Sequence, residues 1–259
     1  SYGFISLHLY NFWGLKHVLV LQKLNQWIKH YIKARSNSVM IFGKILYLDK
    51  NDSLELSING IFEPQETHHI RNRIKKNDIV IDIGANIGYY TVQFADLVGP
   101  KGIVYAFEPD PENFKILKKN IKVNNFNNVK LFNKAVGDHK GFVHLFLSDV
   151  NAGDHRIYSD SSNSRKKIPV EMITLDEVLI CESVTHVDFI KMDIQGAEPI
   201  ALEGMKYIIE KSPQIEMVTE FWPSGIFKAG KKPAEFIRAI SRLRFAIFDL
   251  KTSWFNFQS

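Results

Sequence analysis

The sequence predicts an α/β fold with a doubly wound parallel sheet, and three observations lead to this prediction. A β-branched apolar run at residues 79–83 is followed by a glycine loop and by helical apolar spacing at residues 89–98. Further apolar runs at residues 103–107, 187–192 and 215–219 are each followed directly by an acidic residue. Helical runs alternate with these strands. Such alternation is typical of parallel sheets, whose ligands bind at the carboxyl ends of the strands.

The glycine loop predicts a close approach of the backbone to a ligand. Gly84 lacks a Cβ and can take a positive φ, and N–H groups at the start of the next helix then face the ligand. The spacing Gly84-x-x-x-Gly88 differs from the G-x-G-x-x-G of a pyrophosphate-binding turn, which argues against nicotinamide or flavin. Taken alone, the loop is equally well explained as a plain turn.

Glu108 favours a nucleoside ligand. It follows the second strand, 26 residues after Asp82. A carboxylate at this place accepts the two ribose hydroxyls of a bound nucleoside, and a solvated strand-end carboxylate is the alternative. A ribose-binding carboxylate without a pyrophosphate signature indicates adenosine without phosphates. The cofactor expected first is therefore S-adenosylmethionine.

The N-terminal third of the chain divides into two predicted segments. Residues 1–38 have helical apolar spacing with interleaved lysines, which predicts an amphipathic extension and argues against a transmembrane span. Its residues 1–35 would lie on a membrane surface, pack on their own domain or pack on a second subunit. Residues 39–77 predict a β-hairpin and a cap segment. Residues 78–259 are then the cofactor-binding domain.

The second half of that domain carries four further predictions. Residues 129–136 are expected to form the third strand and residues 245–250 the sixth. One helix is expected to lead from residue 196 to residue 209. The polar loop 148–167 has no secondary-structure pattern, and loops of this length within a domain are often functional. We therefore expect it to form a lid over the substrate.

Composition and missing motifs narrow the class of function. The net charge of +5 permits an anionic partner or membrane surface without requiring one. The single Cys181 excludes an internal disulfide, and no CxxC or HExxH spacing predicts a metal site. Nucleic-acid methylation is disfavoured, because the fourth strand lacks a following [DN]PP[FY] run and Cys181 follows Ile180 rather than a proline. The Asp-Asn pair of metal-assisted catechol-type enzymes is replaced by Glu220-Phe221.

Several segments together resemble one known family. They are GIFEPQET (60–67), IDIGANIGYYT (81–91), AFEPDPENF (106–114), AVGD (135–138), TLDE (174–177), DFIKMDIQGAE (188–198) and the strand end at Glu220. In this order and spacing they resemble the FkbM family of class I S-adenosylmethionine-dependent methyltransferases, over about residues 39–250. The resemblance implies a Rossmann-like sheet and methyl transfer to a hydroxyl oxygen. Gln195 departs from the glutamate typical of the family, and only residues 251–259 remain for a seventh strand.

The resemblance also implies roles by position. Asp82, Gly84 and Asn86 would hold the methionine end, with Thr91 near its carboxylate. Glu108 would bind the ribose. Before the first strand of the sheet, Glu63 is expected either to cap the pocket or to act only as a helix carboxylate. The expected cofactor-binding residues are Glu63, Asp82, Gly84, Asn86, Gly88, Thr91, Glu108, Pro109 and, on the adenine side, Asp138.

Methyl transfer to an alcohol needs an aligned oxygen and a base to take its proton. Asp193 is the first candidate base, because it ends the fourth strand facing the crevice. It could instead orient the substrate or the cofactor amine. Glu198, Glu220 and His155 follow as candidates. A capping role for Glu198 and a surface position for His155 are the alternatives.

The expected function is O-methylation of a hydroxyl on a sugar, a glycoconjugate or a similar small molecule. A non-catalytic cofactor-binding scaffold is the alternative, as are lipid-headgroup, polyketide and protein acceptors. We expect a cytoplasmic protein, with membrane association and self-association left open and no nucleic-acid partner.

Overall fold

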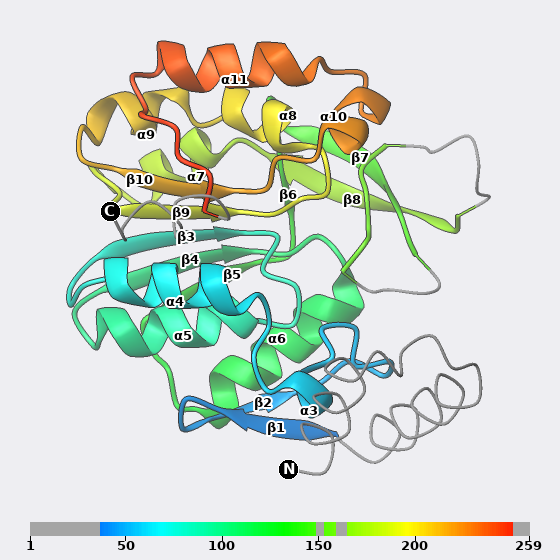
Figure 1. The fold of residues 1–259 in the computed structure, drawn as a ribbon, viewed down its shortest axis with the longest axis vertical. Helices are drawn as coiled ribbons and strands as arrows, with labels where there is room; N and C mark the ends of the chain where they lie inside the picture. Colours follow the sequence, from blue (N-terminus) through cyan, green and yellow to red (C-terminus); the bar gives the residue numbers. More distant parts are fainter. Residues whose placement is uncertain (1–36, 149–152, 159–164, 251–259) are drawn as a thin grey trace, which may run out of the picture.

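A five-stranded parallel sheet forms the centre of the fold in the computed structural model, which describes residues 37–148, 153–158 and 165–250 (Figure 1). Its strand order is β10-β9-β3-β4-β5, and every neighbouring pair is parallel. The chain order reverses between β4 and β9, on either side of β3, which makes the end of β3 a topological switch point. The strands are β3 (Ile79–Ile83), β4 (Ile103–Phe107), β5 (Val129–Phe132), β9 (Phe189–Met192) and β10 (Glu216–Thr219).

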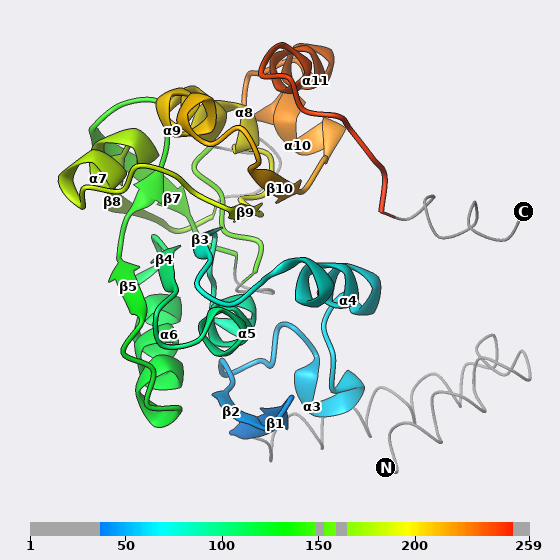
Figure 2. The ribbon, with the colours of Figure 1, turned by 90° about the vertical axis from the view of Figure 1, so that its left-hand side faces the viewer.

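Helices cover both faces of this sheet (Figures 1 and 2). One face packs against α4 (Pro64–Arg73), α5 (Tyr89–Val98) and α6 (Pro111–Val123). The other face packs against α7 (Leu175–Cys181), α8 (Glu198–Glu203), α9 (Lys206–Lys211), α10 (Pro223–Lys228) and α11 (Pro233–Arg242). Strands buried on both faces explain the continuous apolar runs of the sequence, and the predicted α/β fold class is confirmed.

The predicted third strand divides into two. Residues 129–132 form β5, but β6 (Ala135–Val136) joins β8 (Lys167–Ile173) and β7 (Gly141–Phe146) in a separate three-stranded sheet. The side chain of Asn133 donates to the carbonyl oxygens of Glu108 and Pro109, at 2.8 and 3.0 Å. These bonds turn the chain toward the end of β4 and away from the line of β5.

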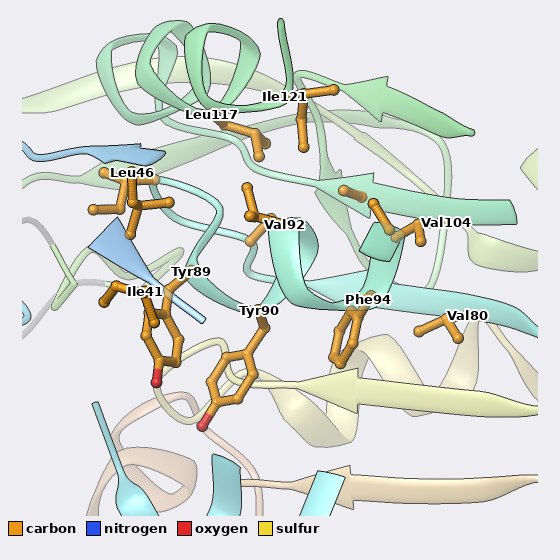
Figure 3. Close-up of a cluster of buried hydrophobic side chains, with 14 of the residues drawn as sticks. Ile41, Leu46, Val80, Tyr89, Tyr90, Val92, Phe94, Val104, Leu117 and Ile121 are labelled. Carbon is orange, nitrogen blue, oxygen red and sulfur yellow. The ribbon is translucent and has the colours of Figure 1, made fainter. Parts of the chain in front are cut away.

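An N-terminal hairpin packs on the α6 side of the sheet. It consists of β1 (Ser38–Ile41) and β2 (Lys44–Tyr47) and is followed by the short helix α3 (Leu56–Asn59). Figure 3 shows Ile41 and Leu46 beside the α5 and α6 side chains of the same apolar cluster. The helix predicted in residues 1–35 and part of the predicted lid lie outside the described residues.

Two predictions about the C-terminal half are wrong. Residues 245–250 form no strand, because Arg244 takes a positive φ of 67° directly after α11 and Phe248 is 77% exposed. The helix predicted to reach residue 209 is divided into α8 and α9. Gly204 lies at the break, where a Cβ would come within 1.9 Å of the Gly137 carbonyl oxygen. Within the described ranges, no helix has both the length and the apolar character to cross a membrane.

Candidate active site

A cleft of about 580 Å³, which includes space open to solvent, lies at the carboxyl ends of β3, β4 and β9. The strand order places the cleft at the switch point beside β3. Its lining comprises Ile83, Gly84, Asn86, Phe107, Glu108, Pro109, Asn113, Lys134, Ala135, Val136, Leu145, Gly153, His155, Ile157, Asp193, Ile194, Gln195 and Ala197.

The glycine loop brings three strand ends together. Gly84 has a φ of +84°, and its N–H donates to the Phe107 carbonyl at the end of β4. A Cβ at Gly84 would lie 2.0 Å from the carbonyl oxygen of Asp193, which follows β9. Both the backbone conformation and the close approach therefore require glycine here. Gly88 also has a positive φ, and a Cβ there would meet Leu117 Cδ1 at 2.6 Å, so its role is packing of α5 on α6.

Glu108 occupies the position expected of a ribose acceptor. Its side chain is buried, and its two carboxylate oxygens accept backbone N–H groups of Asn86 and Asp110, at 2.7 and 2.9 Å. Burial raises the pKa of Glu108 to about 8, although the two N–H groups favour its charged form. Each oxygen retains acceptor capacity for a ribose hydroxyl.

Apolar side chains and His155 also line the cleft. Val136, Leu145 and Ile157 provide walls suited to a flat, largely apolar ring. His155 Nδ1 accepts the Ser148 N–H at 3.0 Å, and its Nε2 lies 3.4 Å from Asp110 Oδ2. Both ring nitrogens of His155 are therefore engaged in holding its loop against the residues that follow β4.

Asp193 also lines the cleft and is held by two side chains. Lys191 Nζ is 3.3 Å from Asp193 Oδ2, and Gln195 Nε2 donates to Asp193 Oδ1 at 2.9 Å. Lys191 is 3% exposed and lies 3.9 Å from Glu66 Oε1. Burial disfavours its charge, but the nearby carboxylates, first of all Asp193, outweigh burial and raise the pKa of Lys191. Its ammonium group is therefore charged at neutral pH.

Further carboxylates lie behind the lining. Asp82 is in register with Lys191 on the adjacent strand, and its Oδ2 accepts the Thr91 hydroxyl at 2.6 Å. Glu63 Oε2 accepts the Tyr90 hydroxyl at 3.3 Å. Asp82 is buried, and burial raises its pKa to about 6, with a further contribution from the charge of Asp193. Glu63 is exposed at the surface, and partial burial of its carboxyl together with the charges of Glu66 and Asp193 raises its pKa to about 7.

Glu198 organises the loop between β9 and α8. Its Oε1 accepts the backbone N–H groups of Ile194 and Gly196, at 3.0 and 3.2 Å, and its side chain is fully buried. Gln195 and Gly196 both have positive φ, so this loop needs such a fixed acceptor to hold its shape. Burial raises the pKa of Glu198 to about 7. Burial, then the charges of Asp193 and Glu198, raise the pKa of Glu220 to about 8.

The structure brings only some of the predicted residues to the cleft. Those that line it are Gly84, Asn86, Glu108, Pro109, His155 and Asp193. Those placed behind it or outside it are Glu63, Asp82, Gly88, Thr91, Asp138, Glu198 and Glu220.

Asp138 does not lie where the sequence interpretation placed it. It is exposed and pairs with His139 at 2.7 Å, whereas Ala135 and Val136 of β6 line the cleft. The Gly137 N–H donates to the Ile173 carbonyl, which completes the β6 pairing before the chain turns outward. The prediction for Asp138 is therefore corrected.

Sequence reasoning missed Lys191, Tyr90 and Gln195. A lysine within the apolar strand FIKM was the available signal for Lys191, since a buried lysine needs a charged partner. The Lys191 Nζ lies 4.6 Å from the centroid of the Tyr90 ring, in a cation–π contact. Only the fold brings these two residues together. Gln195 was noted only as a departure from a family pattern.

The cleft fits S-adenosylmethionine. Gly84 permits close backbone approach, Glu108 offers acceptors for ribose hydroxyls, and Asp193 adds a carboxylate that suits a sulfonium or an ammonium group. Buried carboxylate oxygens of Asp82 and Glu198 have no hydrogen-bond partner within the described residues. These unpartnered oxygens also fit a cationic ligand.

Comparisons with known proteins identify the family of the chain. The family model described as the methyltransferase FkbM domain matches residues 82–246. The 2-O-methyltransferase NoeI of Sinorhizobium fredii is 27% identical over 173 residues, covering 59% of this chain and 70% of that one. The hexuronic acid methyltransferase AglP of Haloferax volcanii is 26% identical over 132 residues, or 51% of each chain.

Among solved structures, precorrin 8W decarboxylase of Methanobacterium thermoautotrophicum aligns with a TM-score of 0.42 at 18% identity, over 71% of this chain and 72% of that one. The family match spans more than half of the chain and includes the glycine loop, Glu108 and Asp193. This chain therefore belongs to the FkbM family and is an S-adenosylmethionine-dependent methyltransferase.

Proposed function

We propose that the protein transfers the methyl group to a hydroxyl oxygen of a sugar or glycoconjugate. The observation that carries this proposal is the position of Asp193. Its carboxylate lines the cleft at the Gly84 end and is held by Lys191 and Gln195. A fixed carboxylate at that end can both orient an acceptor hydroxyl and take its proton.

Different lining residues would bind different parts of the cofactor. Glu108 would accept the ribose hydroxyls, while Val136, Leu145 and Ile157 would enclose the adenine. When bound, the cofactor supplies an electrophilic methyl group on its sulfonium sulfur. Holding the acceptor oxygen in line with that methyl group supplies several kcal/mol of the barrier reduction.

Asp193 is the proposed base by comparison with the other candidates. His155 lies at the Glu108 end and uses both ring nitrogens in holding its loop. Glu198 uses one oxygen in two backbone hydrogen bonds and does not line the cleft. Glu220 also lies behind the lining, so its charge would act on Asp193 rather than on the acceptor. The acceptor proton would pass from the hydroxyl to a carboxylate oxygen of Asp193.

The acceptor class is supported by the names of two relatives, a 2-O-methyltransferase and a hexuronic acid methyltransferase. Sugars present several hydroxyl groups, so regiochemistry would depend on how the loop at residues 153–158 and the acidic end orient the ring. Peripheral membrane contact through residues 1–35, self-association and a cytoplasmic location stay predictions.

A transfer assay tests the proposal. The purified chain is incubated with methyl-labelled S-adenosylmethionine and a panel of neutral and acidic glycosides, lipids and peptides, and NMR locates the new methyl group. We expect a methyl ether on a sugar oxygen, and we expect Asp193→Asn to remove the product. Transfer only to lipid or peptide would contradict the sugar assignment. Tight cofactor binding without transfer to any acceptor would favour a scaffold instead.

A further inference from the structure

Among the described residues, carboxylates outnumber cations around Asp193, beside Gly84. Lys191 lies among these carboxylates and forms ion pairs with Asp193 and Glu66. We call this group the acidic cluster. Its titratable members come from the helices α4, α5 and α8, from the strands β3 and β9, and from the residues next to α4, β9 and β10. They are Glu63, Glu66, Asp82, Tyr90, Lys191, Asp193, Glu198 and Glu220.

Three members of the acidic cluster have buried oxygens without a partner within the described residues. Asp82 is 1% exposed and Glu198 is fully buried, yet Asp82 Oδ1 and Glu198 Oε2 have no hydrogen-bond partner within the described ranges. Glu220 Oε2 is buried in the same way. A desolvated carboxylate oxygen without a partner is costly. A ligand that brings positive charge to this end of the cleft would reduce that cost.

Charge repulsion among the carboxylates of the cluster also favours the binding of a cation. Glu63 is exposed at the surface, and partial burial of its carboxyl together with the charges of Glu66 and Asp193 raises its pKa to about 7. Burial raises the pKa of Glu220 to about 8, and the charges of Asp193 and Glu198 add to the shift. Near neutral pH these side chains are therefore partly protonated. A cation that enters the cleft would displace some of these protons.

We propose that the acidic cluster selects the cofactor by charge, so that the protein binds S-adenosylmethionine more tightly than S-adenosylhomocysteine. The two molecules differ by one methyl group and by the positive charge of the sulfonium. The carboxylates around Lys191 stabilise that charge, and they lose this interaction when the methyl group leaves. Weaker product binding would follow directly from transfer. The inference rests on the cofactor site and not on the acceptor, so a failure to methylate sugars would leave it standing.

Isothermal titration calorimetry of the whole chain tests this proposal without an acceptor. Each ligand is titrated at about pH 7 in phosphate and in Tris, whose different heats of ionisation reveal protons released on binding. We expect S-adenosylmethionine to bind about tenfold more tightly than S-adenosylhomocysteine and to release more protons. Its affinity should increase as pH rises through 7 to 8 as the cluster ionises, whereas the affinity for the product should change much less.

Glu220→Gln keeps the side-chain volume and removes one charge of the cluster. We expect it to lower the preference for S-adenosylmethionine several-fold, mainly through that ligand. Glu235→Gln is the matched control, because Glu235 is exposed on α11 and pairs with Lys232. It should leave the preference unchanged. Thermal unfolding shows whether Glu220→Gln is folded, and Glu63→Gln provides a second test of the same charge effect.

Three results would overturn the inference. The first is wild-type protein that binds S-adenosylhomocysteine as tightly as S-adenosylmethionine, or more tightly. The second is an equal proton release with both ligands. The third is an unchanged preference in folded Glu220→Gln and Glu63→Gln. Absence of binding by both ligands would overturn the inference together with the cofactor assignment.

Discussion

The backbone N–H of Asn86 donates a 2.7 Å hydrogen bond to Glu108 Oε2, which joins the glycine loop after β3 to the end of β4. Asp110 supplies a second N–H to the other oxygen of the same carboxylate. Glu108 therefore has a fixed orientation before any ligand arrives. A preorganised acceptor loses little conformational freedom on binding, so the cofactor gains affinity from this arrangement.

Gly84→Ala should disrupt both the fold and the cleft. The new Cβ would lie 2.0 Å from the Asp193 carbonyl oxygen, and the residue would keep a positive φ. We expect the free energy of unfolding to fall by about 3 kcal/mol, measured by urea denaturation. Gly230→Ala is the control, since it shares a positive φ but has no atom within 4 Å of the new Cβ. It should cost about 1 kcal/mol, and equal losses in both variants would refute the role of the close approach.

Asn120→Ala should detach the N-terminal hairpin from α6. Its buried side chain accepts the Tyr47 N–H at 2.6 Å and donates to the carbonyls of Tyr47 and Ile87, at 3.0 and 2.7 Å. Loss of these bonds leaves buried backbone groups unpaired and should lower the free energy of unfolding by about 3 kcal/mol. Asn124→Ala removes similar but exposed bonds to Ile45 and should cost about 1 kcal/mol. Chemical denaturation of both variants compares them, and a larger loss for Asn124→Ala would contradict this account.

Asp193→Asn should reduce turnover far more than cofactor affinity. The amide keeps the shape of the side chain but cannot accept the acceptor proton, so kcat should fall by about 10²- to 10⁴-fold. The dissociation constant for S-adenosylmethionine should change by about tenfold at most. Steady-state kinetics with the acceptor found by screening, together with calorimetry, separates the two effects. Asp96→Asn, on the surface of α5, is the control. A kcat within about twofold of wild type would place the base elsewhere.

Stability without ligand should fall as pH rises from about 6.5 to 8. The pKa of three carboxyls is raised in the folded state above the ordinary value of 4.5, chiefly by burial, so the folded protein binds more protons than the unfolded chain in this range. Protons favour the folded state there, and their loss costs stability. The groups are Glu198, with a pKa of about 7, and Glu108 and Glu220, with a pKa of about 8.

His69 has the opposite effect on the pH dependence of stability, because burial lowers its pKa from the ordinary value of 6.5. Above pH 6.5 this histidine is largely neutral in both the folded and the unfolded chain, so it changes stability little there. Differential scanning calorimetry across the range measures the net result. We expect a lower unfolding temperature at pH 8 than at pH 6.5. An unfolding temperature that rises with pH would show that these carboxyls are ionised in the folded protein.

Local sequence patterns predicted the strands but not their tertiary partners. Residues 79–83 and 103–107 have the bounds of β3 and β4, because continuous apolar runs are diagnostic of strands buried on both faces. The division after β5 depends on hydrogen bonds from Asn133 to the distant end of β4, which no local pattern encodes. The apolar run at residues 245–250 has the composition of a strand, but composition alone supplies no neighbouring strand to pair with.

The same limit applies to the site. The end of a parallel sheet brings Glu108 and Asp193 to one edge, so their proximity to the cleft followed from topology. Lys191 gains its importance from Glu66 on α4 and Tyr90 on α5, far away in sequence. Asp138 was misplaced because the pairing of β6 with β8 directs the following residue outward.

Calorimetric titration of S-adenosylmethionine into wild type and Glu108→Ala tests whether the cleft binds this cofactor. We expect binding to wild type, a loss of at least about tenfold in affinity in the variant, and no binding of NAD to either. Both proteins should show the same secondary structure by circular dichroism. Binding of NAD, or equal affinity of the folded variant and wild type for S-adenosylmethionine, would contradict the assignment of the Gly84–Glu108 cleft as the cofactor site.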